Sequence, residues 1–123
     1  MEKSYIASSA LLDTWSGNEW TNGLQIDRML DLETLTVKTE NSTYEITILS
    51  GHEGEVLVRG GKFFPEFTRA QLAGCSLGGS FLKMYGVYID FKMEFYWDQK
   101  RIITSYVTRI DVGPRLQTAD HIQ

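Results

Sequence analysis

The chain has 123 residues, a formal net charge of −4 and charged side chains at 23% of its positions. This length suits one hydrophobic core and leaves no room for a second domain of similar size. No window reaches the roughly 18 uninterrupted apolar residues of a membrane helix, and the acidic balance disfavours nucleic acid, so we expect neither a membrane nor nucleic acid as a partner.

Residues 1–23 differ in character from the rest of the chain. Apolar residues recur there at approximate helical spacing and predict a short N-terminal helix followed by a loop: Ile6, Ala7, Ala10, Leu11 and Trp15. The segment lacks the basic start and apolar run of a secretory signal, and the single Cys75 cannot form an internal disulfide. We therefore expect a cytoplasmic protein.

A first hairpin is predicted over residues 35–49. Leu35, Val37 and Thr39 alternate with polar residues, a turn follows at 40–42, and the returning strand again has its apolar residues two apart. A further strand over 55–59 ends at Gly60-Gly61. The three phenylalanines that follow, Phe63, Phe64 and Phe67, are interpreted as a plug for one end of a barrel.

The clearest pattern lies between Val87 and Trp97, where six apolar residues alternate with other residues. A period of two predicts one long, half-buried strand. A polar turn of three residues, 98–100, leads into a strand over 101–112 that is rich in Ile, Val, Thr and Tyr. Two short strands, 69–74 and 80–84, are expected before this hairpin.

These elements predict a mainly β fold, a small antiparallel barrel of six or seven strands over residues 35–112. The short N-terminal helix precedes the barrel and a flexible tail, 114–123, follows it in the same single domain. A barrel is favoured because closure removes exposed sheet edges.

A catalytic or metal site is not indicated. Gly74-Cys75-Ser76-Leu77-Gly78 matches the G-x-S-x-G pattern of serine hydrolases, but that motif requires a following helix where this chain continues as strand. One cysteine and two distant histidines make a poor zinc site. We expect no cofactor, and a non-enzyme rather than an enzyme.

The stretch from Gly74 to Lys83, followed by Gly86 and the long strand, resembles the second half of a PilZ domain, a small β-barrel that binds cyclic di-GMP. Ser76 and Gly79 match two positions of the PilZ motif, whereas Gly74 stands where an acidic or amide residue belongs, and the chain has no R-x-x-x-R. The resemblance implies a barrel. The two departures predict that cyclic di-GMP does not bind at low micromolar concentration.

Residues 39–107 also resemble a group of small bacterial proteins of unassigned function. Glycine-rich turns expose backbone N–H groups that can form an anion nest, and nearby cations would add to it. The candidate ligand-binding residues are therefore Arg59, Lys62, Ser76, Gly78 and Gly79.

Three functions remain open: a non-catalytic binding or regulatory module for a small anion or a protein partner, a small enzyme with a cleft formed by distant residues, and a structural or assembly protein. We also expect a homodimer. Its interface would include apolar residues that a barrel over 35–112 leaves outside: Ile6, Leu11, Trp15 and Trp20.

Overall fold

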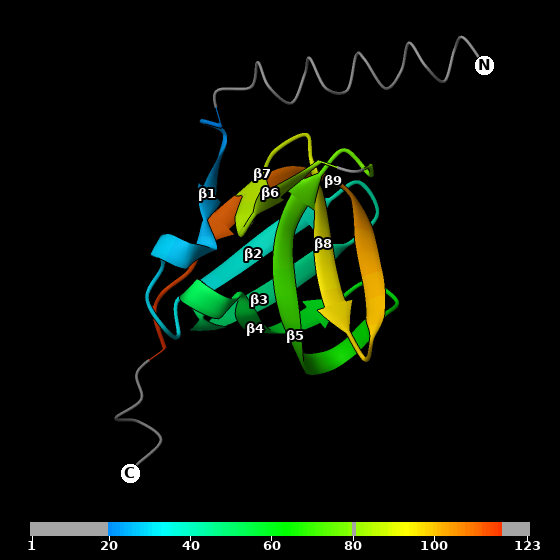
Figure 1. Ribbon diagram of the computed structural model, residues 1–123. Coiled ribbons are helices and arrows are strands. Elements are labelled where there is room, and N and C mark those ends of the chain that lie inside the picture. Colours follow the sequence, from blue (N-terminus) through cyan, green and yellow to red (C-terminus); the bar gives the residue numbers. More distant parts are fainter. Residues whose placement is uncertain (1–19, 80, 117–123) are drawn as a thin grey trace, which may run out of the picture.

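The computed structural model describes residues 20–79 and 81–116, which form two antiparallel sheets (Figure 1). The larger sheet has seven strands: β2 (Thr34–Thr39), β3 (Thr43–Ser50), β4 (Glu55–Gly60), β5 (Phe64–Ser76), β6 (Leu82–Met84), β8 (Lys92–Trp97) and β9 (Lys100–Val112). The smaller sheet pairs β1 (Gly23–Gln25) with β7 (Gly86–Tyr88). The prediction of a mainly β, antiparallel fold is confirmed.

The larger sheet is curled around the core. Its strand order is β4-β3-β2-β9-β8-β5-β6, and an additional pairing joins β4 to β5. The long strand β5 makes this possible, because its first half pairs with β4 and its second half pairs with β8 and β6. Figure 1 shows β5, β8 and β9 side by side with β2 and β3 behind them.

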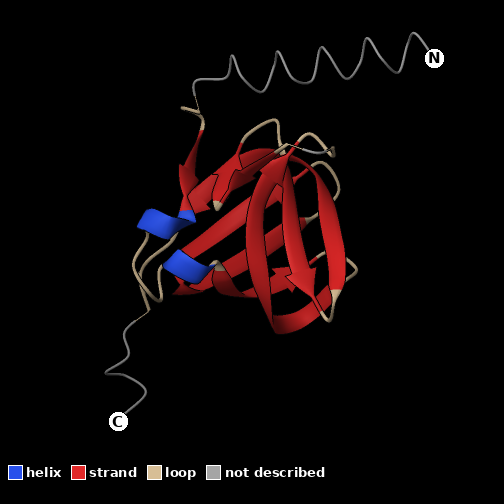
Figure 2. Ribbon diagram, viewed as in Figure 1, coloured by secondary structure: helices blue, strands red, loops and turns tan. Residues whose placement is uncertain are grey.

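The predicted closed barrel of six or seven strands is wrong, because the strands form a seven-stranded sheet and a separate two-stranded sheet. Strand β6 is added at the edge of the large sheet, and β1 and β7 form a sheet of their own. The predicted N-terminal helix falls on residues outside the described part. Within that part the helical elements are two short 3₁₀ turns, η1 (Ile26–Arg28) and η2 (Gly51–Glu53), which lie beside each other where Gly51 packs closely on the Ile26 carbonyl (Figure 2).

Alternation in the sequence places the core side chains correctly. In β2 and β3 the expected inward residues are buried, and β8 contributes Met93 and Phe95. The core is a cluster of sixteen buried residues: Ile26, Leu35, Val37, Tyr44, Ile46, Ile48, Val56, Val58, Phe64, Ala70, Leu72, Val87, Met93, Phe95, Ile102 and Val107. No helix in residues 20–79 and 81–116 has the length and apolar character to cross a membrane.

The single long strand expected between Val87 and Trp97 is wrong. Asp90 adopts a positive φ of 75°, and this turn separates β7 from β8. Strand β7 then pairs with β1 instead of continuing the β8–β9 hairpin. The hairpin itself is confirmed. Its loop has two residues rather than three, because Asp98 and Gln99 both take positive φ and Trp97 pairs with Lys100, as in a type I′ turn.

Only one member of the expected aromatic plug is part of the core. Phe64 is fully buried and packs edge-to-face on Phe95 and Trp97, with ring centroids 5.4 and 5.8 Å away. Phe63 and Phe67 remain 45% and 46% exposed. The β4–β5 hairpin therefore presents two phenylalanine side chains to solvent.

Candidate functional site

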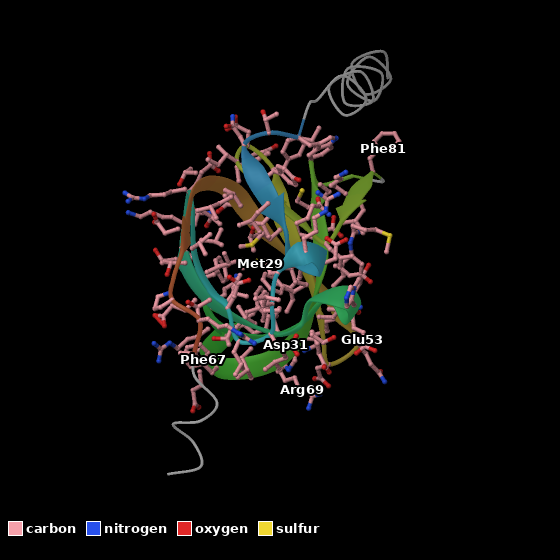
Figure 3. All side chains as sticks on the ribbon, turned by 90° about the vertical axis from the view of Figure 1, so that its left-hand side faces the viewer. Met29, Asp31, Glu53, Phe67, Arg69 and Phe81 are labelled. Carbon is pink, nitrogen blue, oxygen red and sulfur yellow. The ribbon has the colours of Figure 1, made fainter. Side chains whose placement is uncertain are left out.

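The predicted site residues fall into two groups at opposite ends of β5. Arg59 on β4 and Lys62 in the following turn lie near the beginning of β5, whereas Ser76 ends the strand and Gly78 and Gly79 follow it. In Figure 3, Phe67 marks the first end and Phe81, beyond the Gly78–Gly79 loop, marks the other. The five candidate residues therefore lie in two separate groups rather than at one place.

Arg59 already has partners of its own. Its guanidinium donates two hydrogen bonds to the Glu45 carboxylate, at 2.6 and 3.0 Å, and lies 4.4 Å from the centroid of the Phe67 ring. Lys62 lies 5.5 Å from the centroid of the neighbouring Phe63 ring. This end of β5 is a surface of exposed aromatic rings and cations, and the Arg59 charge is balanced by Glu45.

The Ser76 end holds a buried polar network. The Ser76 hydroxyl donates a hydrogen bond to the Glu94 carboxylate and accepts one from the Gly78 N–H at 3.0 Å. Arg101 donates two hydrogen bonds of 3.0 Å to the same carboxylate, one to each oxygen, and a longer one of 3.3 Å to the Gly79 carbonyl. These contacts fix the loop after Ser76 against strands β8 and β9.

Glu94 and Arg101 are an unequal pair. The Glu94 side chain is 3% exposed and the Arg101 side chain 47%. Hydrogen bonds and the negative charge of Glu94 raise the pKa of Arg101 above its ordinary value, so the guanidinium keeps its charge. Both carboxylate oxygens of Glu94 accept hydrogen bonds from neighbouring side chains. We therefore interpret Glu94 as a structural hydrogen-bond acceptor rather than as a catalytic base.

Lys92 stands beside this network. In the register of the sheet, Lys92 lies between Ser76 on β5 and Tyr106 on β9. Its ammonium is 4.9 Å from the centroid of the Tyr106 ring and 3.3 Å from the position a Cβ on Gly78 would take. Among residues 20–79 and 81–116 no carboxylate forms an ion pair with Lys92.

Arginines and lysines differ across the molecule. Within residues 20–79 and 81–116, four arginines pair with carboxylates, Arg59 with Glu45, Arg69 with Glu55, Arg101 with Glu94 and Arg109 with Asp111. Four lysines of the described part lie over aromatic rings, Lys62 on Phe63, Lys83 on Trp20, Lys92 on Tyr106 and Lys100 on Trp97. Charge not already balanced by an ion pair is therefore carried mainly by lysines that stand on aromatic surface.

Cys75 is unsuited to nucleophilic chemistry. It is fully buried in a small cluster with Tyr88 and Phe91, which Trp20 and Leu77 cover. Burial raises the pKa of the Cys75 thiol to about 12, so the thiol is neutral near pH 7. Within the described part of the chain, no three His, Cys, Asp or Glu side chains gather closely enough to hold a metal ion.

A surface groove lies beside β4 and β5, lined by Glu53, Glu55, Arg69, Ala70 and Gln71. Its polar groups bind one another: Arg69 donates to the Glu55 carboxylate at 2.7 and 3.0 Å, and the Gln71 amide donates to the Glu53 carbonyl at 3.1 Å. Figure 3 shows Glu53 and Arg69 on the outside of the molecule. The polar groups of the groove are therefore less available to a ligand than the Lys92 ammonium is.

Sequence reasoning found Ser76, Gly78 and Gly79 through their glycine-rich turn but missed Lys92, Glu94 and Arg101. All three lie on strands whose polar residues alternate with apolar ones, a pattern typical of a solvated face. The chain matches no family model, no curated protein and no solved structure. The resemblance to PilZ domains stays a prediction.

Proposed function

We propose that this chain is a non-catalytic binding module that takes a small anion at the surface formed by Lys92, Tyr106 and the Gly78–Gly79 loop. The observation that carries the proposal is the Lys92 ammonium, which lies against backbone and an aromatic ring and forms no ion pair in the described part of the chain. A cation held in this way has charge available for a ligand.

The surroundings of Lys92 favour an anion over a cation. Lys92 and Arg101 carry two positive charges, and the single negative charge of Glu94 is buried and hydrogen-bonded. Gly79 has open space where a Cβ would project, and Gly78 has a positive φ of 88°, so the loop can approach a ligand closely. Tyr106 is 36% exposed and offers an apolar surface beside the charge.

Isothermal titration calorimetry with pyrophosphate and with citrate tests the proposal. These probes separate phosphate-bearing from carboxylate ligands. Lys92→Gln should weaken binding at least about tenfold, since a charge-assisted hydrogen bond contributes about 1.5–3 kcal/mol. The matched control is Lys38→Gln, which removes the same charge from an exposed position on β2. Absence of saturable binding for both probes, or equal losses in the two variants, would contradict the proposal.

A further inference from the structure

The first half of β5 has an unpaired edge. Phe64 and residues 68–71 pair with β4 on one side, with a register shift between them, whereas pairing with β8 begins only at Gln71 and pairing with β6 only at Gly74. Among the strands that the structure describes, none borders the other side of residues 64–70. An open strand edge presents N–H and C=O groups that can pair with another chain.

The backbone groups on this edge can be identified from the register. The Leu72 N–H donates to the Gly54 carbonyl, and the β4–β5 register continues without a shift from Gln71 to Thr68. Because backbone groups of alternate residues point to alternate sides of a strand, Thr68 and Ala70 direct theirs toward β4. The N–H and C=O groups of Phe67 and Arg69 therefore point to the open side.

The side chains at this edge are also exposed. Phe67 is 46% exposed, and the Arg69 side chain is 69% exposed although it pairs with Glu55. Figure 3 shows both residues at the same end of the molecule. Pro65 lacks an N–H and limits the edge at its N-terminal side, which leaves residues 66–70 for pairing.

We propose that a second copy of this chain docks antiparallel on this edge, with the two-fold axis at Thr68. This register pairs Phe67 of one protomer with Arg69 of the other, and the reverse, so four backbone hydrogen bonds form between the open groups. Residues directly opposite lie on the same face of a sheet, so each Phe67 ring meets an Arg69 guanidinium across the interface. The edge is thus complementary to itself, which favours a second copy as its occupant.

This location differs from the interface expected from the N-terminal segment, which stays a prediction. Trp20 packs on Tyr88 and Phe91 of its own chain, with ring centroids 5.0 and 4.8 Å away, and the other residues of the predicted interface lie outside the described part. The β5 edge is also remote along the chain from Lys92 and the Gly78–Gly79 loop. Ligand binding and dimerisation can therefore succeed or fail independently.

Cysteine cross-linking of the full chain tests the register. Thr68 faces its own symmetry mate in a non-hydrogen-bonded pair, with a Cα separation of about 4.5 Å that a disulfide can span. Thr68→Cys should therefore give a disulfide-linked dimer under mild oxidation. The matched control is Glu66→Cys, whose symmetry mate is displaced by four residues, roughly 14 Å, and should not cross-link. A cross-link in Glu66→Cys equal to that in Thr68→Cys, or none in Thr68→Cys, would overturn the proposal.

Sedimentation equilibrium over about two decades of protein concentration tests the association itself. Phe67→Pro removes an N–H from the open side and should weaken the dimer at least about tenfold relative to Phe67→Ala, which removes the ring and keeps the N–H. Circular dichroism shows whether both variants keep the native β signature. A monomeric wild-type chain at all concentrations, or equal dimer affinities in two folded variants, would overturn the proposed edge.

Discussion

The β4–β5 hairpin places adjacent phenylalanines in opposite environments, and this contrast supports a quantitative prediction. Phe64 is fully buried against Phe95 and Trp97, whereas its neighbour Phe63 is 45% exposed. Truncating a buried phenylalanine removes its transfer free energy and leaves a cavity, at a cost of about 3–5 kcal/mol. We therefore expect Phe64→Ala to lose a large part of a total stability of about 5–15 kcal/mol.

Phe63→Ala is the matched control, because it makes the same chemical change one position away. Its expected effect is within about 0.5 kcal/mol, typical of a surface substitution. Urea denaturation followed by tryptophan fluorescence measures both variants. With a slope of about 1–3 kcal/mol per molar urea, Phe64→Ala should lower the midpoint by roughly 2 M.

The result that would refute this reasoning is an equal loss of stability in the two variants. Equal losses would mean that Phe63 and Phe64 share one buried cluster, as the sequence suggested. An unchanged midpoint in Phe64→Ala would mean that the hairpin does not contribute its side chain to the core.

Four further substitutions test the Ser76 end of β5. Gly74→Ala should lower the thermal midpoint strongly, because Gly74 has a φ of 146° and a Cβ there would collide with the Lys83 carbonyl, whereas Gly79→Ala should be nearly neutral. Ser76→Ala should cost about 1–3 kcal/mol in urea denaturation, since the buried Glu94 carboxylate loses a donor. Burial raises the pKa of the Cys75 thiol from 9.0 to about 12. The stability contributed by the protonated thiol is therefore complete below pH 9 and is lost as the pH rises toward 12. The unfolding free energy should decline less steeply over that window in Cys75→Ala.

The hairpins could be predicted from the sequence because their residues interact locally. Alternation fixes which face of a strand is buried, and the turn residues between Thr39 and Thr43 and between Trp97 and Lys100 bring neighbouring strands together. Both hairpins are present with the expected inward residues. Local pattern and local pairing agree at these positions, so no long-range information was needed.

The break at Asp90 depended on long-range contacts. The Ile89 N–H donates to the Asn22 carbonyl and the Asp90 N–H to the Val107 carbonyl, so distant segments hold the turn. Apolar alternation continues through the turn because Ile89 and Phe91 still face apolar neighbours. Periodicity alone therefore could not separate one strand from two.

Glu94 shows why the candidate site was harder to predict than the fold. It occupies a position where alternation predicts a solvent-facing residue, yet only 2% of the residue is exposed. Gly74 lies opposite Glu94 in the register, and the Lys83 carbonyl of β6 stands where a Cβ on Gly74 would project. The missing side chain lets β6 approach β5 closely, and the Ser76–Gly79 loop that joins these strands then covers Glu94 together with Arg101. The buried network thus depends on the absence of a side chain at Gly74 and on two partners of Glu94, Ser76 at 18 residues and Arg101 at 7 residues along the chain. Strand periodicity does not encode this combination.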